Sequence, residues 1–165
     1  MRLRTRRVAL CGLLLALTLV LGYVESQIPV APTIPGVKLG LSNGVLIFAV
    51  YMLNIPTAFV LMALKVVLSG LMFSGFNAIP YGLAGGLLSL CVMAGLSRVK
   101  GLHPVVVSMA GGLMHNVGQV ALAMVVLGTP SLMYYMAILM AVGLATGAVT
   151  GVAAANVMRH LKNLR

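Results

Sequence analysis

The stretch that decides the fold is PVVVSMAGGLMHNVGQVALAMVVL, residues 104–127, which contains no charged side chain. It is longer than the roughly 20 apolar residues that a membrane-spanning helix needs. Within it, the segment HNVGQ places His115, Asn116 and Gln119 near the middle of the run. We therefore predict a membrane helix over residues 103–127 whose interior carries three side chains that require hydrogen-bond partners.

The composition of the whole chain indicates a polytopic membrane protein. Of its 165 residues, 61% are hydrophobic and only 7% are charged, and the mean hydropathy is +1.13. Soluble domains contain about 25% charged residues. The length predicts one integral membrane domain over residues 1–165.

The charged residues are distributed as topology signals. Eleven lysines and arginines stand against one acidic residue, Glu25. Nine of the positive charges fall in three short clusters at residues 2–7, 98–100 and 159–165, each beside an apolar run. Such clusters are typical of the cytoplasmic ends of membrane helices. They lack interleaved aromatic side chains, so nucleic-acid binding is not expected.

Apolar runs predict six membrane helices. The predicted spans cover residues 8–24, 38–53, 56–73, 78–96, 103–127 and 132–157. An even number of spans returns the chain to the side on which it began, so all three basic clusters lie on the cytoplasmic side. We predict an all-α membrane protein, a six-transmembrane-helix bundle with both termini inside, in a bacterial cytoplasmic membrane.

Small residues mark a further feature of the first span. Ala9, Gly12 and Ala16 recur at i, i+3 and i+7 in its cytoplasmic half. Stripes of small residues let membrane helices approach closely. Similar stripes in the fourth and sixth spans are expected to pack helices within the chain, whereas the stripe in the first span is predicted to dock another subunit.

Lys65 is the most unusual residue in the predicted spans. It lies nine residues after Pro56, hence about 13 Å along the helix and near the bilayer midplane. A charged side chain there costs at least about 2.5–3.5 kcal/mol on insertion scales. We expect Lys65 to face a polar interior.

Other polar residues are predicted to share that interior. His115 and Gln119 lie on one helical face, and Asn116 is rotated about 100° from it. Glu25, at the outer end of the first span, is expected to pair with Lys38 or to gate the site. The candidate substrate-binding residues are Lys38, Asn43, Lys65, His115, Asn116 and Gln119. Their surplus positive charge favours an anionic or electron-rich ligand; the alternative is an interhelical hydrogen-bond cluster that binds nothing.

The sequence argues against catalysis. It contains no CxxC, HExxH, P-loop or GxSxG motif. One carboxylate can form neither an acid–base pair nor an aspartate cluster for magnesium. We predict no enzyme activity, no metal and no cofactor.

Four segments carry a resemblance to a known family: PGVKLGLSN (35–43), SGLMFSG (69–75), YGLAGGLLSLCVMA (81–94) and GGLMHNVGQVALAMVVLGTPSLMYY (111–135). They resemble the heptaprenyl diphosphate synthase component I family, also called the Gx transporter family. In its six-helix form this family is similar to the substrate-binding S components of energy-coupling-factor (ECF) vitamin transporters. The resemblance implies a transmembrane coupling subunit with ATPases as partner, contacted by small residues of the first helix.

The enzyme in the family's name conflicts with the residues present. Prenyl diphosphate synthases hold diphosphate through magnesium on aspartate-rich motifs, and this chain has no aspartate. The resemblance therefore implies a transporter component for an isoprenoid, quinone-related or flavin-like compound. Two alternatives stay open: a stand-alone secondary transporter coupled to protons through Glu25 or His115, and a non-catalytic membrane subunit associated with prenyl diphosphate synthesis.

Overall fold

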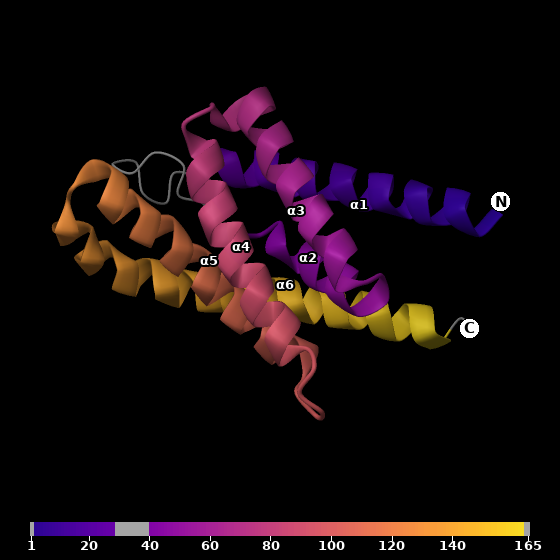
Figure 1. Ribbon diagram of the computed structural model, residues 1–165. Helices are drawn as coiled ribbons and strands as arrows, with labels where there is room; N and C mark the ends of the chain where they lie inside the picture. The colour runs from indigo at the N-terminus through magenta and orange to yellow at the C-terminus, as the bar shows by residue number, and fades with distance from the viewer. Residues whose placement is uncertain (1, 29–39, 164–165) are drawn as a thin grey trace.

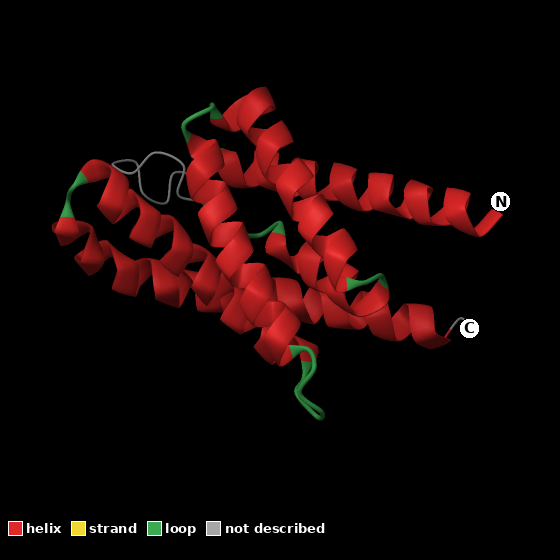
Figure 2. Cartoon of the chain, in the orientation of Figure 1, coloured by secondary structure: helices red, strands yellow, loops and turns green. Residues whose placement is uncertain are grey.

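The computed structural model describes residues 2–28 and 40–163, and these residues form a bundle of α-helices (Figures 1 and 2). The helices are α1 (Arg2–Ser26), α2 (Asn43–Met52), α3 (Ile55–Ser69), α4 (Ala78–Leu96), α5 (Pro104–Leu127) and α6 (Met133–Asn163). A π-helical turn, Gly70–Ser74, extends α3, and a 3-10 turn, Pro130–Leu132, precedes α6. No strand occurs in these described ranges, which confirms the all-α prediction.

Five helical segments are long and apolar enough to cross a membrane. They are Thr5–Ser26, Ile55–Ser74, Ala78–Leu96, Pro104–Leu127 and Pro130–Asn163. Their bounds follow the predicted first, third, fourth, fifth and sixth spans. The two ends of the chain lie at the same end of the bundle (Figure 1). The number of crossings and the orientation in the membrane stay predictions.

The second predicted span, residues 38–53, differs from the described helix. α2 has 10 residues and is therefore about 15 Å long, half of the roughly 30 Å hydrocarbon thickness. Gly40, three residues before α2, has a left-handed φ of 83° that a helix cannot continue through. Residues Asn43 to Val50 are all buried, so this short helix lies inside the bundle.

The helix ends follow from local sequence signals. The side chain of Asn54 accepts a hydrogen bond from the Thr57 N–H at 2.8 Å and caps α3, with Pro56 in the first turn. His103 caps α5 in the same way, accepting from the Val105 N–H at 3.3 Å. These caps separate consecutive apolar runs into distinct helices.

Glycines hold α5 against its neighbours. A Cβ on Gly112 of α5 would lie 2.2 Å from the carbonyl oxygen of Gly143 in α6, and one on Gly143 would lie 2.6 Å from that of Gly112. A Cβ on Gly118 would lie 2.8 Å from the carbonyl oxygen of Ala84 in α4. The backbone of α5 is thus in direct contact with those of α4 and α6, as the stripes of small residues in α4 and α6 predict.

Candidate polar site in the membrane interior

A small cavity lies where α1, α3, α4 and α5 surround the start of α2. Its walls are formed by Gly22, Glu25, Ser42, Lys65, Val66, Ser69, Ala78, Gly82, His115 and Gln119. The cavity volume is about 20 Å³, which is room for about one water molecule. A substrate of many atoms enters this site only if its walls move apart.

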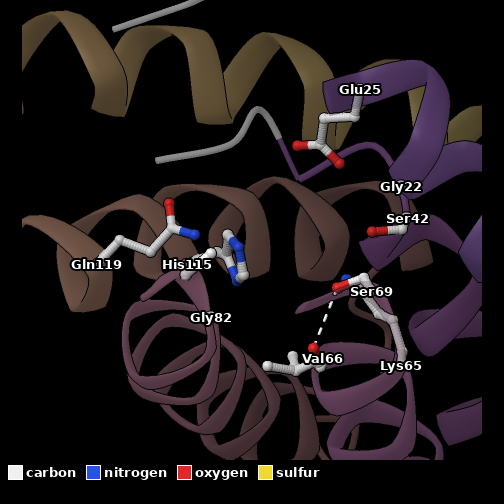
Figure 3. A pocket seen from close by; sticks show the side chains of 10 residues that line it. Gly22, Glu25, Ser42, Lys65, Val66, Ser69, Gly82, His115 and Gln119 are labelled. Carbon is white, nitrogen blue, oxygen red and sulfur yellow. Dashed lines mark hydrogen bonds between the residues drawn. The ribbon is translucent and has the colours of Figure 1, made fainter. Parts of the chain in front are cut away.

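α5 supplies two of the polar walls. His115 is 4% exposed and Gln119 is fully buried, one helical turn apart. The imidazole ring and the amide both point from α5 into the space that faces Glu25 (Figure 3). A Cβ on Gly85 of α4 would lie 2.5 Å from the His115 carbonyl oxygen and 2.8 Å from Gln119 Cγ. A glycine at position 85 therefore leaves the room that these two residues occupy.

Lys65 enters from α3 and is 7% exposed. Its Nζ donates a hydrogen bond of 3.3 Å to the Oδ1 of Asn43, which is the first residue of α2. Ser69 lies one turn further along α3 and donates to the carbonyl oxygen of Val66 at 3.1 Å, drawn as a dashed line in Figure 3. Lys65 thus lies beside polar side chains of α2 and of its own helix.

Glu25 closes the site from α1. Glu25 is 2% exposed, and its carboxylate accepts a hydrogen bond from the backbone N–H of Gly40. A Cβ on Gly40 would lie 2.9 Å from Asn43 Nδ2 and 3.5 Å from the His115 ring, so a glycine fits where the chain enters α2. Glu25 is therefore tied to the backbone that leads into α2. Lys38, its predicted partner, lies outside the described residues.

Asn116 lies apart from this cavity. Its side-chain nitrogen donates to the carbonyl oxygen of Leu139 in α6 at 2.6 Å, as expected for a residue rotated away from His115 and Gln119. The predicted candidates that the structure brings together are Asn43, Lys65, His115 and Gln119, with Glu25 beside them. Asn116 instead connects α5 to α6.

Two polar wall residues were absent from the predicted set. Ser42 and Ser69 line the cavity, and Ser69 follows Lys65 by four residues, which places both on one helical face. The Oγ of Ser42 and the Nδ2 of Asn43 are buried and have no hydrogen-bond partner among the residues that the structure describes. Buried polar atoms in folded proteins are nearly always paired. These two atoms, one on the cavity wall and one beside it, are therefore available to hydrogen-bond a ligand.

The chemistry of the site suits recognition of a small polar group. It combines an ammonium, a carboxylate, an imidazole and amides within a membrane-embedded bundle. Among the described residues, no group of three or more His, Cys, Asp or Glu side chains is placed to hold a metal ion.

Comparison with known families gives a match over most of the chain. Residues 14–157 match the family described as heptaprenyl diphosphate synthase component I. The chain belongs to this family. The match confirms the resemblance carried by the PGVKLGLSN and HNVGQ segments, and with the five apolar helices it identifies a multi-pass membrane protein of the component I family. No curated protein and no solved structure matches the chain.

Proposed function

We propose that this component I family member is the substrate-binding subunit of an ECF-type uptake transporter, similar to S components. It acts in a bacterial cytoplasmic membrane on a small anionic or electron-rich compound of the isoprenoid, quinone-related or flavin-like class. The observation that carries the proposal is the buried Lys65 at a polar cavity within the bundle. A charge kept at such depth costs several kcal/mol, so a functional role is the default hypothesis.

The site residues have distinct roles in this proposal. Lys65 neutralises negative charge on the ligand, while Asn43 and Gln119 orient it through their amides. His115 donates or accepts a further hydrogen bond. Glu25 gates the site, because its bond to the Gly40 N–H ties α1 to the start of α2. Asn116 acts indirectly, by fixing the position of α5 against α6.

Ligand entry requires movement of one wall, and α1 is the best candidate. In its apolar stretch 22% of the residues are buried, against 39–44% in α3, α4 and α5. The fraction is also 22% in α6, but α6 contributes no residue to the cavity walls. α1 contributes Gly22 and Glu25 to the cavity, so its displacement would open the site while the α4–α5–α6 contacts stay intact. The Oγ of Ser42 and the Nδ2 of Asn43, which have no partner among the described residues, could then bond to the ligand.

The partner proposal rests on the two faces of α1. The buried residues Leu14, Thr18, Gly22 and Glu25 lie on the face toward the bundle. Ala9, Gly12 and Ala16 are exposed, and at 100° per residue they fall on the opposite face. A Cβ on Gly12 would meet no atom within 4 Å. This outward stripe is the surface proposed for the coupling subunit, which carries the ATPases.

A copurification experiment tests the partner. The tagged chain is expected to copurify from its native membranes with a transmembrane protein and ATPases, identified by mass spectrometry. Gly12→Leu should abolish this, because the added side chain stands on the docking face. Gly95→Leu is the matched control, since Gly95 is also exposed with no atom within 4 Å of a built Cβ. Full uptake by the chain alone in proteoliposomes would overturn the proposal and favour a proton-coupled secondary transporter.

A second candidate function is favoured by the family description itself. The name denotes a component of a heptaprenyl diphosphate synthase. A non-catalytic membrane subunit of that kind would copurify with a soluble prenyltransferase instead of ATPases. The same mass-spectrometric experiment therefore separates the two functions.

A further inference from the structure

A second, larger cavity lies apart from the polar site. It has a volume of about 550 Å³, and its walls come from the C-terminal part of α6, the end of α2 and the start of α5. Its walls are formed by Tyr51, Met52, Leu102, His103, Pro104, Val105, Val152, Ala155, Asn156, Met158, Arg159, Lys162 and Asn163. None of these residues belongs to the site around Lys65, and the volume lies within the usual range of ligand pockets.

The cavity has an apolar wall and a positively charged edge. Carbon-rich side chains such as Met52, Val105 and Met158 form its walls, while Arg159 and Lys162 stand exposed on α6 at its edge. The Arg159 guanidinium donates to Asn156 Oδ1 at 3.1 Å, which directs it along the same edge. The only acidic side chain of the protein, Glu25, lines the other cavity. The edge is therefore strongly positive beside an apolar wall.

We propose that this cavity binds a phosphate-bearing amphiphile. The phosphate or diphosphate group sits between Arg159 and Lys162, and the hydrocarbon chain lies against Met52, Val105 and Ala155. Arginine pairs with phosphate oxygens in a bidentate way, and lysine adds a point charge. Basic pockets between membrane helices at the cytoplasmic surface suit phosphate headgroups. An acidic membrane phospholipid and a prenyl diphosphate share this chemistry.

The proposal is tested by binding to the full chain purified in detergent. The probes are dioleoylphosphatidylglycerol, farnesyl diphosphate and inorganic diphosphate, with zwitterionic dioleoylphosphatidylcholine for comparison, each followed by native mass spectrometry and by titration. At least one of the two anionic amphiphiles is expected to bind at least about tenfold more tightly than inorganic diphosphate and than phosphatidylcholine. The amphiphile that does so identifies the source of the headgroup.

Two variants at the cavity and one control variant locate the binding. The double substitution Arg159→Gln/Lys162→Gln should weaken the amphiphile at least about tenfold, because it removes the charged hydrogen-bond donors. Arg6→Gln/Arg7→Gln removes equal charge from exposed positions of α1 and should have no effect. Ala155→Phe should fill the apolar wall and weaken the amphiphile while both charges remain. Since Arg159 and Lys162 are exposed, their substitution tests the charge requirement even if Ala155→Phe lowers stability.

Each of the following results would refute the proposal. Equal affinity of the Arg159/Lys162 and Arg6/Arg7 double variants would place the bound amphiphile elsewhere. Equal binding of inorganic diphosphate and the amphiphiles would mean a free-phosphate site with no role for the apolar wall. Binding of phosphatidylcholine as tight as that of both anionic amphiphiles, or no binding of either, would also refute the proposal. None of these outcomes bears on ligand recognition at Lys65.

Discussion

The contact between α5 and α6 allows a stability prediction whose magnitude follows from the coordinates. Gly112→Ala adds a Cβ that would lie 2.2 Å from the carbonyl oxygen and 3.1 Å from the carbonyl carbon of Gly143. Both are backbone atoms, so no side chain can rotate out of the way and the helices must separate. Overpacking of this kind typically costs about 1–3 kcal/mol.

A matched variant isolates that cost. Replacing glycine by alanine inside a helix stabilises the helix by up to about 1 kcal/mol. Gly12→Ala, in the middle of α1, gains the same helix propensity as Gly112→Ala. A Cβ on Gly12 meets nothing within 4 Å. The difference in unfolding free energy between the two variants is therefore the overpacking term alone, about 1–3 kcal/mol in favour of Gly12→Ala.

The assay is reversible unfolding of the purified chain in mixed detergent micelles with increasing SDS, followed by circular dichroism. Gly112→Ala should unfold at a lower SDS fraction than the parent chain, and Gly12→Ala at an equal or higher one. If Gly112→Ala proves as stable as Gly12→Ala, the α5 and α6 backbones are not in contact at this point and the described packing is wrong.

Three further predictions concern the site, the α5–α6 bond and the topology. Lys65→Met should leave the SDS midpoint unchanged or raised, since a buried charge is costly, yet reduce affinity for the compound copurified with the parent chain about ten- to a hundredfold; unchanged affinity would make this lysine structural. Asn116→Leu removes the donor to the Leu139 carbonyl and should lower the unfolding free energy by about 0.6–2 kcal/mol, and no loss would show that the bond contributes nothing. Cysteines placed singly at positions 3 and 163, in a background lacking the native cysteines, should both resist an impermeant thiol reagent in intact cells; labelling of one alone would refute the predicted orientation.

Much of the helical framework could be predicted from hydropathy, because an apolar run of about 20 residues is typical of a membrane-spanning helix. The span predicted at residues 78–96 coincides with α4, and the cap at Asn54 follows from the NIP sequence between two runs. The short α2 could not be predicted in the same way. Hydropathy does not distinguish a residue buried among helices from one facing lipid, and the left-handed Gly40 is a matter of backbone conformation.

The polar site was predictable in part for a similar reason. The cost of burying Lys65 implies polar neighbours, and the i, i+4 spacing of His115 and Gln119 puts both on one face. Depth along separate helices cannot reveal which helices meet, however. The bond between Lys65 and Asn43 and the bond between Glu25 and the Gly40 backbone depend on the position of α2, and that position is set by tertiary packing.

The shortness of α2 has a consequence for the biogenesis of the protein. A segment of 10 residues cannot remain in a bilayer by itself, and most of its surface is covered by α3, α5 and α6. Because α6 is synthesised last, α2 lacks one of its main neighbours until translation is nearly complete. During synthesis α2 must therefore stay beside the insertion machinery, or in a non-native position, until α6 has been made. A ribosome-bound chain that stops before α6 should retain an unfinished polar site, although every residue of that site has already been translated.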